Sequence, residues 1–156
     1  PLREGKHFDI CESMRRVLIS MEKKITDRHL DVDADIPEEP ILVRGDNDMI
    51  TQVIYNLLEN ATKFAREGTT LYLGVTTIDG KARVTVRNLG DTIPAEELPL
   101  LFERFHKSDK SRSEDKDGVG LGLYIVKTIL EQHKEKISVT SENGVTTFAF
   151  SLSMDA

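Results

Sequence analysis

The stretch Asn47–Glu67, NDMITQVIYNLLENATKFARE, is the longest helical pattern in the chain, and the rest of the predicted fold is arranged around it. Asp46 before it suits an N-cap, and Gly68 closes it. At 100° per residue, its apolar side chains gather on one side: Ile50, Val53, Ile54, Leu57, Leu58, Ala61 and Phe64. The sequence therefore predicts a helix that packs one side against a core.

A polar stripe runs along the same predicted helix. Gln52, Asn56, Asn60 and Lys63 project into an arc of about 80°. Glu, Lys and Ala are favoured over Asn on a solvated helix face, because Asn costs a few tenths of a kcal/mol in helix propensity. Carboxamide oxygens and an ammonium group suit a hydrated Mg²⁺ and a polyphosphate. The stripe alone leaves two interpretations open, a binding site or a wet face that happens to carry amides.

The segments around this helix predict a two-layer α/β sandwich, a mixed sheet with helices on one face. We expect an amphipathic helix over residues 8–28 with Asp9 as its N-cap, and a short helix over 95–105. The last helix is expected over 119–134. Alternating apolar residues predict a half-buried strand over 29–36, a short strand over 41–45, and two hairpins, 69–78 with 81–88 and 136–141 with 145–152. Asp79-Gly80 is the turn of the first hairpin.

Composition limits the class of protein. The chain has 156 residues, enough for one domain with a substantial core, and is 38% hydrophobic and 31% charged. Its net charge of −6 argues against a nucleic-acid-binding surface, and it carries no membrane-spanning apolar run and no signal peptide. The single cysteine, Cys11, lies in an amphipathic pattern and is expected to be a buried structural thiol. We therefore expect a cytoplasmic globular domain.

Glycines gather before the last predicted helix, in GVGLGLYIV. Gly118, Gly120 and Gly122 would give bare N–H groups at a helix start, where a phosphate is attracted, although a flexible hinge is the alternative. The spacing fits neither a P-loop nor a Rossmann turn.

Before these glycines, residues 106–118 carry no apolar side chain and read as a solvated loop. Lys107, Lys110 and Arg112 could close this loop over phosphates as a lid, anchored at its first end by Phe102 and Phe105.

The stretch Val86–Pro94, VRNLGDTIP, ends a predicted strand with a polar cluster. Asn, Gly and Asp are also the commonest turn formers, so the stretch alone indicates either a turn or a binding site.

Four stretches in this order resemble the N, G1, F and G2 boxes of sensor histidine kinases: QVIYNLLENATKF, VRNLGDTIP, LFERFHKSDKSR and GVGLGLYIV. GVTTFAF resembles the weaker motif that precedes the last strand of that domain. The similarity covers about residues 8–153, nearly the whole chain. The chain thus resembles the catalytic ATP-binding domain of these kinases, in the superfamily shared with gyrase, the heat-shock-90 chaperones and the MutL mismatch-repair proteins.

The resemblance implies a Bergerat-type ATP-binding fold with ATP and Mg²⁺ as cofactors. It implies that Asn60 holds Mg²⁺, that Asn56 supports the metal and its water, and that Lys63 touches phosphate, which makes these three the catalytic candidates. Thr146 would lie near the adenine edge. The remaining ATP-binding candidates are Asn88, Gly90, Ile93, Phe105, Lys107, Lys110, Arg112, Gly118, Val119, Gly120, Leu121, Gly122 and Leu123.

Two positions depart from the family pattern. Most relatives end the strand before the G1 turn with Asp, which accepts from the adenine amino group, and carry a second glycine four residues later. Here Asn88 and Thr92 stand at those places, while Gly90 is retained. Asn88 can still accept through its side-chain oxygen but lacks charge assistance, worth about 1 kcal/mol. Thr92 would narrow the floor of the pocket. We expect weaker binding that remains selective for adenine.

The acceptor of the phosphoryl group is expected on another domain. None of His7, His29, His106 and His133 has the sequence context of a phosphoacceptor, and each is interpreted as structural. We therefore expect one catalytic domain over 1–156, with 1–7 as the tail of a junction from a missing dimerisation and phosphoacceptor hairpin domain, and with 106–118 as the ATP lid. The fragment is expected to be a monomer that does not insert in a membrane, the cytoplasmic part of a two-component kinase that serves a response regulator.

Two other functions remain open. The departures at Asn88 and Thr92 would suit a nucleotide-sensing pseudokinase that binds ATP without transferring phosphate. A serine-directed kinase of the anti-sigma-factor type is usually complete in about this length.

Overall fold

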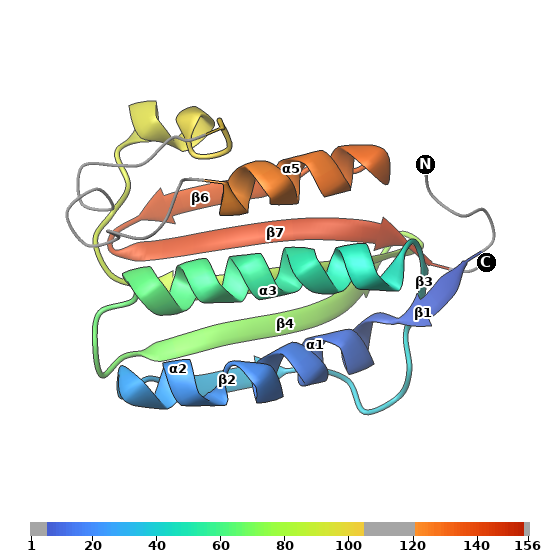
Figure 1. The fold of residues 1–156 in the computed structure, drawn as a ribbon, viewed down its shortest axis with the longest axis horizontal. Coiled ribbons are helices and arrows are strands. Elements are labelled where there is room, and N and C mark those ends of the chain that lie inside the picture. The colour runs from blue at the N-terminus through green and yellow to red at the C-terminus, as the bar shows by residue number, and fades with distance from the viewer. Residues whose placement is uncertain (1–5, 105–120, 155–156) are drawn as a thin grey trace.

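The computed structural model describes residues 6–104 and 121–154 and consists of a five-stranded sheet with helices against one face (Figure 1). The strand order is β2-β4-β5-β7-β6. β2 runs parallel to β4, and the other neighbours are antiparallel, so the sheet is mixed, as predicted. The strands span β2 Asp31–Asp35, β4 Thr70–Ile78, β5 Lys81–Leu89, β6 Ser138–Glu142 and β7 Val145–Ser153.

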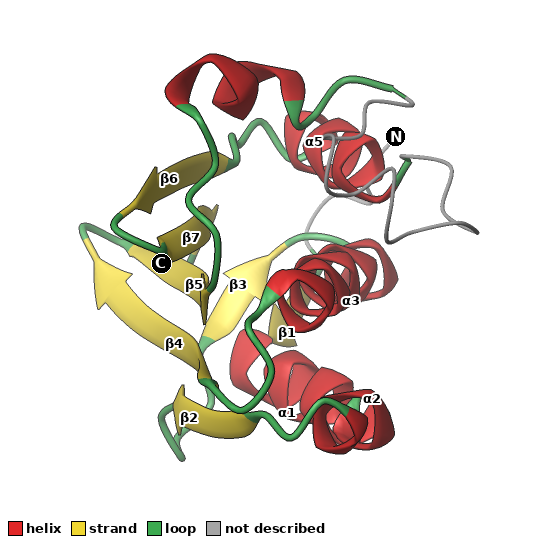
Figure 2. Cartoon of the chain, turned by 90° about the vertical axis from the view of Figure 1, so that its left-hand side faces the viewer, coloured by secondary structure: helices red, strands yellow, loops and turns green. Residues whose placement is uncertain are grey.

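The helix layer covers one face of this sheet, which Figure 2 shows from the end of the sandwich. Its members are α1 Ile10–Ser20, α2 Glu22–Asp27, α3 Asn47–Phe64 and α5 Gly122–Gln132. α3 is the central helix, and it packs on α1 at one side and on α5 at the other (Figure 1). The sheet's inward-facing residues, such as Val86, Phe148 and Leu152, are fully buried beneath these helices. The predicted two-layer α/β sandwich is confirmed.

Two tight turns fix the register of the antiparallel strands. In both, Asp79-Gly80 and Asn143-Gly144, the two residues have positive φ, 51° and 77° in the first and 51° and 80° in the second. Turns of two left-handed residues match the twist of paired strands, and Asn or Asp followed by Gly adopts them readily. The predicted hairpin at Asp79-Gly80 is confirmed, and the second turn sets which β6 residue faces which β7 residue.

The N-terminal segment differs from its prediction. Instead of one helix over residues 8–28, residues His7–Asp9 form β1, which pairs with β3 Leu42–Arg44 in a separate two-stranded sheet. Asp9 is the N-cap, as expected, and accepts from the Cys11 N–H at 3.0 Å. The helix then breaks at Met21, where the Ser20 hydroxyl donates to the Val17 carbonyl at 2.7 Å.

Other boundaries also differ. The predicted half-buried strand exists as β2, but all five of its residues are exposed, with Val32 39% exposed. β2 lies at the sheet edge beside β4 alone, which sequence alternation does not reveal. The predicted helix over 95–105 is a 3₁₀-helix, η1 Ala95–Leu100, that contains Pro99, a residue without an N–H to donate. Of the predicted last helix, the described part spans Gly122–Gln132.

Cys11 is fully buried, as predicted, and burial raises the pKa of its thiol. Among residues 6–104 and 121–154, no helix is both long and apolar enough to cross a membrane.

Candidate functional site

The amide stripe of α3 faces the start of α5. Asp46 caps α3, as predicted, by accepting from the Met49 N–H at 3.1 Å. The Gln52 amide donates to Asn56 Oδ1 at 2.7 Å, and Asn56 Nδ2 donates to the Gly122 carbonyl at 3.1 Å. Asn56 is only 9% exposed. The structure thus joins two predicted site residues, Asn56 of the N-box stretch and Gly122 of the glycine stretch, and it refutes the interpretation of Asn56 as part of a wet face.

Asn60 and Lys63 continue the stripe toward the C-terminal end of α3, and both are half-buried. Lys63 Nζ lies 6.0 Å from the centre of the Phe64 ring. A hollow of about 210 Å³ opens at this end of the helix. Its lining joins the end of α3 to the turn after β5 and comprises Arg28, Lys63, Phe64, Ala65, Arg66, Glu67, Gly90 and Asp91.

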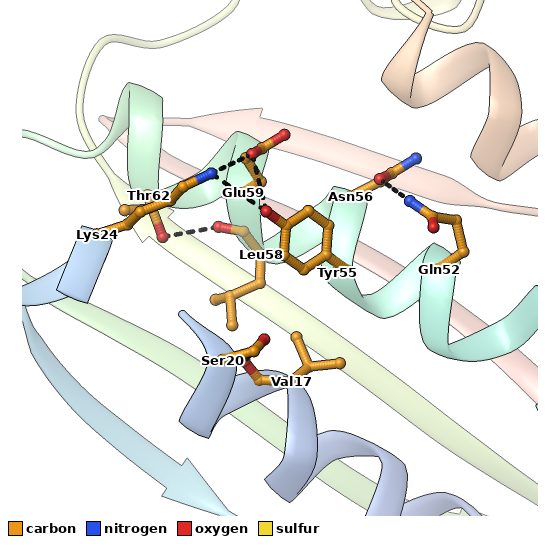
Figure 3. Close-up of polar contacts among 9 residues, drawn as sticks. All are labelled: Val17, Ser20, Lys24, Gln52, Tyr55, Asn56, Leu58, Glu59 and Thr62. Atoms are coloured by element: carbon orange, nitrogen blue, oxygen red, sulfur yellow. Dashed lines mark hydrogen bonds and ion pairs between the residues drawn. The ribbon is translucent and has the colours of Figure 1, made fainter. Parts of the chain in front are cut away.

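Next to the amide stripe, α3 carries an ion pair with α2. Glu59 accepts from Lys24 of α2 at 2.7 Å, and Tyr55 OH lies 3.1 Å from the same ammonium group. The hydrogen bond to Glu59, followed by that to Tyr55, raises the pKa of Lys24. Figure 3 shows this group and the Gln52–Asn56 pair as two separate sets of contacts along α3. Glu59 adjoins Asn60 in sequence but is held against α2, so it does not stand where a catalytic base on the amide stripe would.

The sheet supplies a polar row below the helix layer. Asn88 of β5 pairs with Thr146 of β7, which pairs with Ser141 of β6. All three are buried, with 5%, 4% and 8% of their surface exposed. The adjacent row on the same face, Val86, Phe148 and Val139, is apolar. The apolar core of the sheet thus ends at a row of buried polar side chains that includes Asn88 and Thr146.

Two hydroxyls of this row are tied together. Ser141 Oγ lies 2.8 Å from Thr146 Oγ1, and the Ile93 N–H donates to Ser141 Oγ at 2.8 Å. The predicted site residues Ile93 and Thr146 thus meet through Ser141, which sequence reasoning missed. The signal was available, because a two-residue turn at Asn143-Gly144 places Ser141 opposite Thr146.

Gly90 is required by the backbone around it. A Cβ at this position would lie 2.7 Å from the Phe64 carbonyl oxygen, too close for any side chain. The Gly90 N–H donates to the Gly144 carbonyl at 2.8 Å, and Thr92 Oγ1 accepts from the Gly144 N–H at 2.7 Å. The turn after β5 is therefore held on the β6–β7 turn, and Thr92 contributes to that attachment.

The start of α5 brings further predicted residues to the same end of the sandwich. Leu121 and Leu123 are half-buried, and Leu123 packs against the core. The space beside Gly122 is open, since a Cβ there would meet nothing within 4 Å. Phe102 packs edge-on against Phe148, with ring centroids 6.1 Å apart, as expected of an anchor. The other lid and glycine candidates lie outside the described residues: Phe105, Lys107, Lys110, Arg112, Gly118, Val119 and Gly120.

The described histidines are structural or at the surface. His133 joins α5 to the cap of α3, because its Nε2 accepts from the Asp46 N–H at 3.1 Å while Nδ1 donates to the Ile129 carbonyl at 2.8 Å. His29 lies 3.6 Å from Glu67 at the surface, and His7 is exposed in β1. His106 lies outside the described residues.

The amide oxygens of the stripe could bind a Mg²⁺ ion that takes most of its oxygen ligands from a bound phosphate and from water. Within the described ranges, no three His, Cys, Asp or Glu side chains gather to form a metal site. The stripe offers carboxamide oxygens instead, which suit Mg²⁺ only if phosphate and water supply the rest of its six oxygens. Asn60 is half-buried one turn beyond Asn56 on the same helix.

Comparison with known proteins points the same way. Residues 45–156 match the family model described as histidine kinase-, DNA gyrase B- and HSP90-like ATPase. The sensor histidine kinase CusS of Escherichia coli O6:H1 is 35% identical over 149 residues, which cover 96% of this chain and 31% of CusS. The chain thus spans about a third of the length of the curated relatives it matches.

Solved structures are similar over nearly the whole chain. The catalytic domain of histidine kinase ThkA superposes with a TM-score of 0.85 at 27% identity, covering 97% of this chain and 96% of that one. ThkA in complex with the response regulator TrrA gives a TM-score of 0.78 at 27% identity, covering 96% and 42%. Full-length ShkA in complex with AMPPNP gives 0.79 at 25% identity, covering 97% and 31%.

Proposed function

The chain belongs to the histidine kinase-, DNA gyrase B- and HSP90-like ATPase family, and from this premise we propose that it is the ATP-binding catalytic domain of a two-component sensor histidine kinase. In this proposal the domain positions the γ-phosphate of Mg·ATP for attack by a histidine imidazole on a separate dimerisation domain. The observation that carries the proposal is the hollow at the end of α3, which is lined both by Lys63 of the amide stripe and by Gly90 of the turn that follows Asn88.

The row on the sheet would bind the base. Asn88 is buried and directly opposite Thr146, and within the described part of the chain its side chain makes no hydrogen bond. Its oxygen can accept from the amino group of adenine, and its nitrogen can donate to a ring nitrogen. Gly90 lets the backbone of the turn pass within contact distance of Phe64 at the end of α3.

The helix stripe would bind the phosphates. Asn60 would hold Mg²⁺, whose chemistry when bound is to neutralise the phosphate oxygens and fix their geometry. Asn56 is fixed between Gln52 and Gly122 and would support the water shell of the metal. Lys63, at the end of the stripe, would bring a positive charge to the phosphates. These residues orient and neutralise, which is most of what catalysis of phosphoryl transfer requires.

The partners follow from the same proposal. The acceptor histidine would come from the dimerisation hairpin domain of the same kinase, and the phosphoryl group would pass to a response regulator aspartate. The complex of ThkA with the response regulator TrrA supports such a partner, because the similarity to ThkA covers 96% of the present chain. We expect the domain to be monomeric, with residues 106–118 as its lid and 1–7 as the junction to the hairpin domain, in a cytoplasmic setting.

Two assays test the proposal. Calorimetric titration with ATP, with and without Mg²⁺, should give adenine-nucleotide binding that the metal strengthens. Addition of the cognate hairpin domain and labelled ATP should then give acid-labile phosphohistidine. No nucleotide binding at millimolar ATP with Mg²⁺ would refute the proposal.

A second candidate is a nucleotide sensor without phosphotransfer, which the neutral Asn88 and the presence of Thr92 favour. Confirmed ATP binding without phosphohistidine on the cognate hairpin domain would select it. An acid-stable phosphorylated product would instead select the serine-directed alternative.

A further inference from the structure

Ser141 lies beside the proposed base-binding residues without belonging to any of the predicted motifs. We propose that Ser141 is a positioning residue that fixes the direction of the Thr146 hydroxyl proton and thereby sets the preference of the site for adenine over guanine. This inference rests on the proposed function, because it concerns how the same site reads its base. It is carried by the two 2.8 Å hydrogen bonds of Ser141 and by the strand register.

The first step concerns the direction of the hydrogen-bonded chain. The Ile93 N–H can only donate, so Ser141 Oγ must accept from it. A hydroxyl that accepts a hydrogen bond becomes a better donor, and head-to-tail chains strengthen one another. The favoured arrangement is therefore Ile93 N–H to Ser141, then Ser141 O–H to Thr146 Oγ1.

In the opposite arrangement, the Ser141 hydroxyl proton has no acceptor among the described residues. If Thr146 donated to Ser141, the Ser141 oxygen would accept twice and its own proton would need a third partner. In residues 6–104 and 121–154, Ser141 Oγ contacts no other polar atom within hydrogen-bond distance, and the residue is only 8% exposed. A buried donor without an acceptor is costly. In the favoured chain the same cost falls on Thr146, which is 4% exposed and donates to no other atom among these residues, so burial does not separate the two arrangements. The chain that starts at the Ile93 N–H does separate them, and it directs the Thr146 proton away from Ser141.

The second step concerns what Asn88 leaves undecided. An amide presents an oxygen acceptor and a nitrogen donor and can rotate to offer either. Adenine offers an amino donor beside a ring-nitrogen acceptor, whereas guanine offers a carbonyl acceptor beside a ring N–H donor. Asn88 alone can therefore meet both bases. A Thr146 hydroxyl whose proton points toward the base can donate to the ring nitrogen of adenine, directly or through a water. It cannot bond the ring N–H of guanine, because both groups are then donors.

The experiment measures ATP and GTP affinities by calorimetry, with Mg²⁺, for the unaltered chain and three variants. Ser141→Ala frees the Thr146 hydroxyl to turn, so we expect the ratio of ATP to GTP affinity to fall by about tenfold, chiefly through tighter GTP binding. Ser141→Thr keeps the hydroxyl and should restore the ratio. Ser138→Ala is the matched control, because Ser138 lies on the same strand and donates to the Ala149 carbonyl at 3.2 Å, away from the row.

The outcomes separate the inference from the proposed function. ATP binding with an affinity ratio unchanged in Ser141→Ala would overturn the inference and leave the proposed function standing. An equal loss for both nucleotides, in Ser141→Ala and not in Ser141→Thr, would show a merely structural role and also overturn it. Should Ser141→Ala not fold, Ser141→Cys, of similar volume and a weaker hydrogen bonder, should shift the ratio in the same direction, and no shift would count against the inference. No ATP binding by the unaltered chain would overturn both proposals.

Discussion

The two sides of α3 carry similar side-chain pairs in different surroundings (Figure 3). On the side toward α5, Gln52 and Asn56 are four residues apart and bonded, and Asn56 is buried against the Gly122 carbonyl. On the side toward α2, Tyr55 and Glu59 are also four residues apart and share Lys24, with the Lys24 and Glu59 side chains 54% and 42% exposed. The contact of Asn56 is neutral and buried, whereas the contact of Lys24 with Glu59 is charged and half exposed.

The difference in burial between these two contacts determines how much each one matters energetically. An exposed ion pair gains little, because water screens it and two long side chains must be ordered. A buried amide must have its partners, and removing it strands their hydrogen-bonding groups. On the proposed function, we therefore expect ligand binding at the buried amide that faces α5, although Glu59 has the more reactive functional group.

The largest test compares two neighbours in the sequence. Asn60→Ala should lower Mg·ATP affinity by about 100-fold or more, roughly 2.8 kcal/mol, because the variant loses the proposed metal ligand. Glu59→Ala, one position away on the other side, should leave the affinity within about twofold. Calorimetry with Mg²⁺ measures both. Equal losses in the two variants, or none in either, would remove the distinction between the sides.

A smaller effect is expected on stability. Asn56→Ala removes the buried amide that bonds both Gln52 and the Gly122 carbonyl and opens a small cavity between α3 and α5, so we expect a loss of about 1–3 kcal/mol in the free energy of unfolding. Urea denaturation measures it. Gln52→Ala is the control, since Gln52 is exposed and its loss should cost under about 1 kcal/mol. Similar costs for both would mean that the enclosure of Asn56 adds nothing.

The fold could be predicted where local chemistry decides it. Asp9 and Asp46 cap helices, and Asp79-Gly80 turns a hairpin, because each choice depends on a few adjacent residues. The break between α1 and α2 at Met21 is not marked by any Gly or Pro, and the exposure of β2 depends on its place at the sheet edge. Neither is visible in hydrophobic periodicity.

The site could be predicted in part for the same reason. The stripe on α3 follows from helical geometry, so spacing predicts that Asn56 belongs to it, whereas the contact of Asn56 with Gly122 joins residues 66 positions apart and is found only in the structure. Ser141 was missed because its importance comes from a row across three strands, in which each member looks like an ordinary strand residue. The two-residue turn at Asn143-Gly144 fixes the register of β6 against β7, and this register could have been used to predict that Ser141 lies opposite Thr146.

The third test introduces a charge into the neutral site. Asn88→Asp should tighten ATP binding several-fold, about 1 kcal/mol, because a carboxylate accepts from the adenine amino group more strongly than an amide does. Calorimetry with ATP and with ADP measures it. Asp91→Asn, in the exposed turn beside it, controls for the change in net charge. Weaker binding by Asn88→Asp would show that the Asn88 nitrogen, and not its oxygen, is used.

The smallest effect is expected on the charged side of α3. Glu59→Gln removes the carboxylate that pairs with Lys24, and at neutral pH it should lower the free energy of unfolding by only about 0.2–1 kcal/mol, since both side chains are half exposed. The pH dependence gives a sharper result. Glu59 raises the pKa of Lys24, so this contribution is fully present below the pKa that Lys24 has in the unfolded chain, and it is lost as pH rises through the higher folded-state value. The difference between the unaltered chain and Glu59→Gln in urea denaturation should therefore shrink at strongly alkaline pH. A difference that stays constant through this range would mean that Glu59 acts through packing or through Tyr55, and the two sides of α3 would then differ in burial but not in the nature of their bonds.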